Sequence, residues 1–289
     1  MLTHGAAMVT GAAGAQAPRS PAALVAALHA EIAAYGSAVV AFSGGIDSTV
    51  VLALAAQVLG ERALGVTGLS PSVAPAEAAD AERLAKRLGA RLLFADTAEL
   101  ARPGYVANGP DRCFHCKTEL YGVCRAIADA HGLRCIANGT NADDTGDWRP
   151  GLVAAADADV RSPLLACGLR KAEVRAVGRH LGLPNWDKPA LACLASRLPY
   201  GTAVTPSRLA AVDAVERALR GFGFREVRAR HHGQAVRLEV ESGRVSELSA
   251  LGAAGALDAP VHAAGFLRWS IEPDGFRSGR LNDALIPPP

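Results

Sequence analysis

One group of residues has the types and spacing needed to bind a polyphosphate. In the segment SGGIDST, small hydroxyl side chains surround two glycines between a β-branched apolar run and an apolar helical pattern. Glycines let the backbone approach a ligand closely, and the free amides of a helix N-terminus attract an anion. The segment lacks the spacing and the lysine of the usual nucleotide triphosphatase loop. The residues predicted to form this site are Ser43, Gly44, Gly45, Asp47, Ser48 and Thr49.

A second group consists of cysteines. Cys113 and Cys116 form a CxxC pair, which suits zinc, an iron–sulfur cluster or dithiol redox chemistry. The chain has no second CxxC, so a third thiolate must come from elsewhere. Cys193 is the best candidate because it lies in an irregular, proline-flanked segment. Three thiolates leave one metal position open, as in a working site, whereas His115 as fourth ligand would make a structural zinc site.

Two further groups could contribute to the same chemistry. The segment GTNADD places Gly139 and Thr140 beside the adjacent carboxylates of Asp143 and Asp144, which suit a hydrated Mg²⁺ bridging phosphates; the alternative is a simple turn.

Arg228 and Arg230 are two residues apart and would project from one face of a strand, where guanidinium groups suit phosphate or carboxylate. The alternative is a solvated strand face.

A regular scaffold is predicted to position these residues. Strand-like segments alternate with helical patterns, which predicts an α/β fold with a parallel sheet covered by helices on both faces. The strands are expected at residues 37–42, 63–69, 91–96 and 133–139, and the helices at 20–35, 48–59, 75–88 and 116–131. In such sheets ligands bind at the carboxyl ends of the strands, where the SGGIDST and GTNADD segments fall.

The pattern changes towards the C-terminus. After a helix at residues 170–181, a proline-rich stretch leads to a smaller α+β region. Its helices are expected at residues 207–219 and 245–251, and its strands at 225–232, 235–242 and 266–272. We therefore expect three parts: a flexible leader (1–19), a nucleotide-binding domain (20–200) and a smaller domain for substrate binding or oligomerisation (201–289). Its short strands could pair between chains, which favours a homo-oligomer.

Composition excludes several classes of protein. The chain has 289 residues, enough to bury a sizeable core, and 30 Lys and Arg against 28 Asp and Glu. With this balance the chain carries no large net positive charge, so no nucleic acid partner is expected. No apolar run is long enough to cross a bilayer, and the N-terminus does not resemble a signal peptide. The cysteine content without signs of secretion favours a reducing cytoplasm.

Taken in order, these motifs resemble the LarE-type ATP-dependent sulfur transferases of the ATP pyrophosphatase (PP-loop) superfamily. The resemblance runs from about residue 20 to residue 283 and rests on SGGIDST, DRCFHCK, GTNADDTGDWRPG, VRSPL, WDKPALACLASRLPYG, VRARHHG and GFRSGRLN. It implies a PP-loop, HUP-like fold and an enzyme that splits ATP into AMP and pyrophosphate. Such enzymes adenylate pyridinium-3,5-biscarboxylic acid mononucleotide and form a thiocarboxylate, in making the nickel-pincer nucleotide cofactor of lactate racemase.

The resemblance also implies roles for individual residues. The SGGIDST residues would hold the pyrophosphate of ATP, with Asp47 near its Mg²⁺, and Arg228 and Arg230 would face the phosphate of the mononucleotide. Family members with a single cysteine give up that side chain's own sulfur. Members that also carry CxxC hold a 4Fe–4S cluster on three cysteines, and its fourth iron carries an exogenous sulfide from a donor that the resemblance does not name. With Cys113, Cys116 and Cys193, this chain is similar to the second kind.

Three other functions are consistent with parts of the pattern. Iron–sulfur tRNA thiolases can unite the same ATP loop with three cysteines, although many have Lys where this chain has Ile46. Amide-forming synthetases of the NAD and GMP synthetase type share the loop but need no cysteine trio. A non-catalytic iron–sulfur or zinc sensor could retain the nucleotide pocket.

Overall fold

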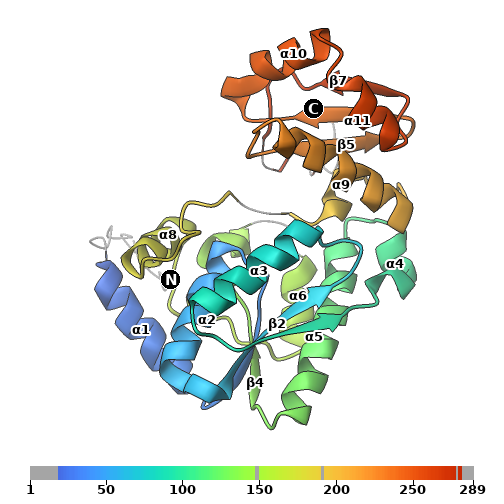
Figure 1. The fold of residues 1–289 in the computed structure, drawn as a ribbon. Helices are drawn as coiled ribbons and strands as arrows, with labels where there is room; N and C mark the ends of the chain where they lie inside the picture. Colours follow the sequence, from blue (N-terminus) through green and yellow to red (C-terminus); the bar gives the residue numbers. More distant parts are fainter. Residues whose placement is uncertain (1–18, 147–149, 190–191, 278, 282–289) are drawn as a thin grey trace, which may run out of the picture.

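The chain folds into two lobes, shown in Figure 1. The computed structural model describes residues 19–146, 150–189, 192–277 and 279–281. The N-lobe (residues 19–189) contains a four-stranded sheet, and the C-lobe (residues 202–277) contains a three-stranded sheet. The leader predicted at residues 1–19 lies outside the described residues except for Arg19. Within the described residues, no helix is long and apolar enough to cross a membrane.

The sheet of the N-lobe is entirely parallel, as predicted. Its strands lie in the order β3-β2-β1-β4. Their bounds are β1 (Ala38–Ala41), β2 (Ala63–Leu69), β3 (Leu92–Asp96) and β4 (Cys135–Ala137). All four residues of β1 are buried, because a central parallel strand is covered on both faces; this explains its continuous apolar sequence.

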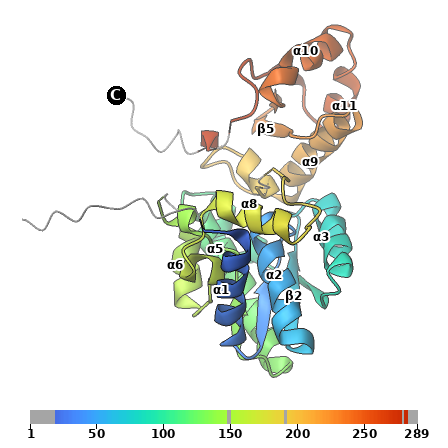
Figure 2. The same cartoon turned by 90° about the vertical axis from the view of Figure 1, so that its left-hand side faces the viewer.

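Helices cover both faces of this sheet, which confirms the predicted α/β architecture (Figure 2). One face packs against α1 (Pro21–Ala33), α2 (Ile46–Leu59), α3 (Pro75–Arg87), α7 (Pro163–Ala166) and α8 (Lys171–His180). The other face packs against α5 (Arg112–Ala130) and α6 (Pro150–Asp157). Sequence patterns did not predict several short elements that lie in the connections. These are the helix α4 (Pro103–Val106) and the 3-10 turns η1 to η3 (Gly60–Arg62, Glu99–Ala101, Ala142–Gly146).

Helix α5 begins earlier than predicted. The expected start was residue 116, but the turn at residues 109–111 continues directly into the helix: the Arg112 amide donates to the Gly109 carbonyl and the Phe114 amide donates to that of Asp111. Cys113, which was expected to precede the helix, therefore lies with Cys116 on the first turns of α5.

The C-lobe combines a mixed sheet with helices. Its elements are α9 (Pro206–Gly221), β5 (Arg228–His232), β6 (Ala235–Glu239), η5 (Ser242–Arg244), α10 (Val245–Ala253), α11 (Asp258–Ala263) and β7 (Arg268–Ile271). Strand β6 pairs antiparallel with β5 and parallel with β7. The core of this lobe also contains Ala74, Tyr105, Leu194 and Leu198, which come before it in the chain. The domain boundary at residue 200 stays a prediction.

Candidate functional site

The phosphate loop (residues 43–49) lies at the carboxyl end of β1 and opens α2. Gly44 has a φ of 71°, a conformation that favours glycine. The Ser43 amide donates to Ser48 Oγ at 3.2 Å, and the hydroxyls of Ser48 and Thr49 donate to the Gly45 carbonyl at 3.0 and 2.8 Å. Gly45 is the N-cap and supplies no side-chain capping bond. The first amides of α2 thus suit an anionic ligand.

A lysine that sequence analysis missed lies at this loop. Lys171, the first residue of α8, donates through Nζ to Asp47 Oδ2, and Asn141 Nδ2 donates to Asp47 Oδ1 at 3.3 Å. A lone lysine at a helix start carries no motif signal, so only the fold reveals it. It supplies the positive charge that the loop's own sequence lacks.

A buried asparagine, also missed, holds the loop from the other side. Asn185 Nδ2 donates to the Gly44 carbonyl at 3.0 Å and to Thr49 Oγ1 at 2.9 Å. Gly139, predicted to line the ATP site, packs directly against the loop: a Cβ on it would lie 2.6 Å from the Ser48 amide nitrogen. Thr140 follows, and its amide donates to Asn138 Oδ1 at 3.0 Å. Gly139 therefore permits close packing of β4 on α2.

The two carboxylates predicted to bind Mg²⁺ organise the same segment. Asp144 Oδ2 accepts from the Asn141 amide at 2.9 Å, and Asp143 Oδ2 accepts from the Lys171 amide at 2.8 Å. The Asp144 contact closes a turn within the GTNADD segment, and the Asp143 contact connects that segment to Lys171. Their magnesium role stays a prediction.

The segment that carries Cys193 (the Cys193 segment, residues 192–198) is held by several distant elements. It contains the 3-10 turn η4 (Leu194–Arg197). The Leu194 amide donates to the Ser72 carbonyl, just beyond β2, at 3.0 Å. Because β2 neighbours β1 in the parallel sheet, the Cys193 segment is anchored at the same sheet edge as the phosphate loop.

Three buried arginines donate to carbonyls of the Cys193 segment. Arg112 Nη1 reaches the Ala195 carbonyl at 2.9 Å, and Arg230 Nη1 reaches that of Ser196 at 2.9 Å. Arg197 Nη1 reaches the Cys193 carbonyl at 3.0 Å. These side chains come from α5, β5 and η4, so both lobes fix the position of Cys193.

A buried ion pair anchors Arg197. Its Nε and Nη2 donate to the carboxylate of Glu216 at 2.6 and 3.0 Å, and Arg220 Nη2 donates to the same carboxylate at 2.9 Å. Burial alone would raise the pKa of Glu216, but the guanidinium groups of Arg197 and Arg220 lower it. Glu216 is therefore a charged anchor beneath the Cys193 segment.

The three predicted cysteine ligands lie in one region. Cys116 and Cys193 both pack against the C-lobe core, and Cys113 is exposed one turn away from Cys116. Burial raises the pKa of the Cys116 thiol to about 12, and the nearby Cys193 is the next largest cause. Among the described residues, no three His, Cys, Asp or Glu side chains are placed to hold a metal ion.

The remaining cysteines and His115 lie elsewhere. The His115 ring pairs with Asp111 at 3.1 Å and lies against Gly104, which does not support it as a fourth zinc ligand. Cys124 is fully buried in the N-lobe core, as predicted. Cys135 and Cys167 are partly buried beside that lobe's other helices.

Arg228 and Arg230 lie on one face of β5, but this face is not solvated. Their exposed fractions are 5% and 9%. Arg230 pairs with Glu239 through two bonds of 3.1 Å, and the Arg228 guanidinium lies 4.5 Å from the centre of the Phe276 ring. Burial, with Arg197 and Arg230 nearby, lowers the pKa of Arg228 to about 10. The solvated-face alternative is wrong, and the phosphate role stays a prediction.

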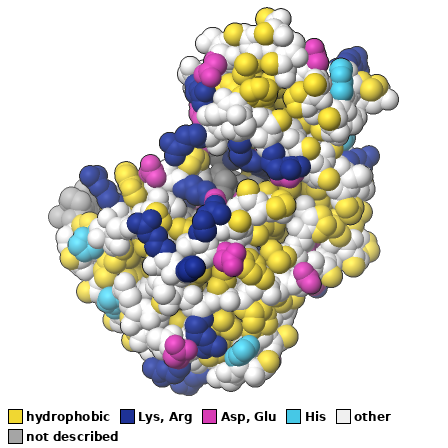
Figure 3. Space-filling model, viewed as in Figure 1, with side chains coloured by type: hydrophobic (Ala, Val, Ile, Leu, Met, Phe, Trp, Pro, Cys, Tyr) yellow, Lys and Arg dark blue, Asp and Glu magenta, His cyan; other side chains and the backbone are white. Residues whose placement is uncertain are grey.

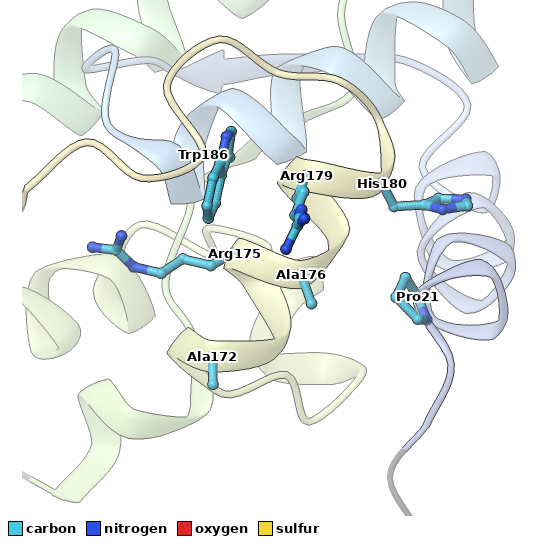
Figure 4. Close-up of a pocket in the computed structure, with 7 residues that line it drawn as sticks. All are labelled: Pro21, Ala172, Arg175, Ala176, Arg179, His180 and Trp186. Carbon is cyan, nitrogen blue, oxygen red and sulfur yellow. The ribbon is translucent and has the colours of Figure 1, made fainter.

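Two surface features complete the description. Lys and Arg side chains gather where the two lobes meet (Figure 3). A separate hollow of about 570 Å³ lies against α8, lined in part by Arg175, Arg179, His180 and Trp186 (Figure 4). The Arg179 guanidinium lies 5.4 Å from the centre of the Trp186 ring. No residue of the phosphate loop or the Cys193 segment lines this hollow.

Comparison with known proteins identifies the family. The family model of NAD synthase matches residues 22–103, which include the phosphate loop. The pyridinium-3,5-bisthiocarboxylic acid mononucleotide synthase of Lactiplantibacillus plantarum is 36% identical over 247 residues, which cover 85% of this chain and 89% of that protein. This chain belongs to the same family, within the PP-loop ATP pyrophosphatases.

Two uncharacterized proteins are also similar to this chain. One, from Synechocystis sp., is 39% identical over 248 residues, covering 86% of this chain and 92% of that protein. The other, from Methanocaldococcus jannaschii, is 23% identical over 203 residues, covering 70% and 77%. The family relation accounts for the phosphate loop at the sheet edge.

Proposed function

We propose that this protein is an ATP-dependent sulfur transferase that converts a carboxylate of pyridinium-3,5-biscarboxylic acid mononucleotide into a thiocarboxylate, for the nickel-pincer nucleotide. One observation carries the proposal: the phosphate loop and the Cys193 segment are anchored at the same edge of the N-lobe sheet. The substrate class comes from the related Lactiplantibacillus plantarum synthase, whose name describes the bisthiocarboxylic acid product.

The first proposed step is adenylation. A substrate carboxylate oxygen attacks the α-phosphorus of ATP, and the bond to pyrophosphate breaks with the electron pair leaving on pyrophosphate. The uncapped amides of α2 and the Lys171 ammonium would stabilise this departing charge. Asp47, with Asp143 and Asp144 beside it, would hold Mg²⁺, which adds charge neutralisation when bound.

The second proposed step replaces oxygen by sulfur. Hydrosulfide attacks the acyl carbon, the C–S bond forms, and the C–O bond to AMP breaks with its electron pair leaving on AMP. The hydrosulfide proton passes to solvent, so the products are thiocarboxylate and AMP. Activation is needed because a free carboxylate is a poor electrophile.

We propose that the three cysteines hold an iron–sulfur centre. Cys113, Cys116 and Cys193 are free cysteines, and their thiolates are the ligands that iron–sulfur clusters take in proteins. Bound there, a 4Fe–4S cluster would offer an open iron that binds sulfide. Cys116 holds its proton strongly, so binding would release that proton.

The charged junction between the lobes suits the proposed substrates, since ATP and the mononucleotide are both anionic (Figure 3). We propose that Arg228 and Arg230 contact the mononucleotide phosphate. Arg230 would then share its guanidinium between that phosphate and Glu239.

The test is an anaerobic reaction of the reconstituted protein with ATP, Mg²⁺, the mononucleotide and sulfide. We expect AMP, pyrophosphate and a thiocarboxylate, identified by mass spectrometry. Cys193→Ala should abolish the thiocarboxylate, while Cys167→Ala, which packs against the N-lobe core and not against that of the C-lobe, should retain it. AMP formation only with tRNA, or an amide formed from ammonia with no sulfur product, would overturn the proposal in favour of a thiolase or an amide synthetase.

A further inference from the structure

Arg112 is a buried arginine that the proposed chemistry leaves unexplained. It stands directly before Cys113 on the first turn of α5 and is 4% exposed. Its Nη1 donates to Asn108 Oδ1 at 2.5 Å and to the Ala195 carbonyl at 2.9 Å. Both acceptors are neutral, and in the described part of the chain no carboxylate forms an ion pair with it.

The other two arginines at the Cys193 segment differ in this respect. Arg197 pairs with Glu216 and Arg230 pairs with Glu239, so each has a carboxylate as counter-charge. An isolated buried charge is costly, and proteins generally pair it. The bonds of Arg112 instead join two segments of the chain.

Arg112 and Asn108 also connect the CxxC helix to the Cys193 segment mechanically. The fully buried Asn108 donates through Nδ2 to the carbonyls of Pro199 and Thr202, both at 2.8 Å. Arg112 continues this contact to Ala195. The start of α5 and the chain around Cys193 are thus held together by two adjoining side chains.

We infer that Arg112 is a positioning residue, which holds the Cys193 segment against the CxxC end of α5. The inference rests on the proposed three-cysteine centre. It adds a residue of the DRCFHCK motif whose role the cysteines alone do not explain.

The test compares Arg112→Gln, which removes the charge, with Arg112→Lys, which keeps the charge but loses the planar fork. Arg125→Gln, further along the same helix and away from the CxxC pair, is the matched control. Each protein is reconstituted anaerobically with iron and sulfide and then challenged with a chelator. We expect Arg112→Gln to retain about tenfold less iron than the parent, as for other residues that support metal ligands. The iron retained by Arg112→Lys should lie between that of Arg112→Gln and that of the parent. Arg125→Gln should retain as much iron as the parent.

A second readout tests positioning without any metal. In a background with Cys124, Cys135 and Cys167 replaced by Ala, copper-catalysed oxidation of the metal-free protein should join Cys193 to the CxxC pair, as mapped by peptide analysis. Arg112→Gln should slow this reaction, while Arg125→Gln should not.

The outcomes separate this inference from the proposed function. If the parent protein binds no iron, the iron–sulfur part of the proposed function fails, and the cross-linking rates alone decide the positioning role. Parent-like iron retention and cross-linking in Arg112→Gln would overturn the inference. So would a loss of ATP–pyrophosphate exchange as large as the loss of iron, because that would indicate general damage.

Discussion

The phosphate loop and the Cys193 segment are built in different ways. Both have bonds among their own residues, such as those of the Ser48 and Thr49 hydroxyls to Gly45 and that of Arg197 to the Cys193 carbonyl. The distant side chains that contact the phosphate loop, Asn141, Lys171 and Asn185, belong to the N-lobe. The Cys193 segment depends on Arg112 of the N-lobe and on Glu216 and Arg230 of the C-lobe. The first site is therefore completed within the N-lobe, and the second is completed by the assembly of both lobes.

The two sites should therefore respond differently to substitutions. Damage to the packing of the C-lobe should displace the Cys193 segment while leaving the phosphate loop largely intact. A charge change at the phosphate loop should impair adenylation without moving the cysteines. Substitutions in the two regions can test this contrast.

The largest expected effect is on stability, from Glu216→Gln. This change leaves Arg197, which is 1% exposed, without its carboxylate. Removing one partner of a buried ion pair typically lowers the free energy of unfolding by about 3–5 kcal/mol. Urea denaturation followed by circular dichroism measures the change. Glu247→Gln, which breaks the exposed pair with Arg244, is the control and should have a much smaller effect.

If Glu216→Gln were as stable as its control, the Cys193 segment would not depend on the buried ion pair. The claim that contacts from the C-lobe hold the Cys193 segment in place would then be wrong.

The next largest effect should come from Lys171→Met. Its ammonium contacts Asp47 in the phosphate loop and would face the departing pyrophosphate. Loss of one such electrostatic contact costs about 10²- to 10³-fold in rate. ATP–pyrophosphate exchange with the mononucleotide measures it, and Lys86→Met, exposed at the end of α3, is the control. Unchanged exchange in Lys171→Met would show that the α2 amides suffice.

Sequence patterns predicted the N-lobe well because its signals are local. Strands of the parallel sheet are buried apolar runs, and the cap Ser20 with Pro21 marks the start of α1. The missed residues have no such signal. Lys171 and Asn185 lie 124 and 136 residues from the loop side chains that they contact. A lysine on a helix and an asparagine after a proline look like ordinary surface residues until the fold brings them to the loop.

The arginines of β5 show a second limit. Alternation predicted the strand and the shared face of Arg228 and Arg230. It could not show that Glu239, on the neighbouring strand, would bury and pair one of them. Strand pairing is a long-range property, so a charged face that looks solvated in sequence can become the interior of a lobe.

The smallest effect is a pH dependence in the C-lobe, set by His231. Its ring is buried against Phe266, and its Nδ1 accepts from the Gly233 amide at 3.2 Å, which requires that nitrogen to be unprotonated. Burial lowers the pKa of His231 below the ordinary histidine value of 6.5, and the charges of Arg208 and His232 lower it further. The unfolded chain therefore binds a proton at a higher pH than the folded chain. Stability should fall as the pH drops below about 6.5, with a slope of at most about 1.4 kcal/mol per pH unit from this one proton.

Denaturation of the parent and of His231→Phe across about pH 5 to 7 isolates this contribution, since the variant keeps a ring against Phe266 but does not titrate. Plotted against pH, the free energies of unfolding of the two proteins should have the same slope near neutral pH. In acid the curve of the parent should fall more steeply, because only the parent loses the His231 contribution. Parallel curves would mean that the folded C-lobe can hold a proton on His231 without losing stability. The burial of polar groups in this lobe would then matter less for stability than the buried arginine contacts around Cys193 indicate. ATP–pyrophosphate exchange compared over the same range shows whether the phosphate loop is independent of this titration, as its contacts within the N-lobe predict.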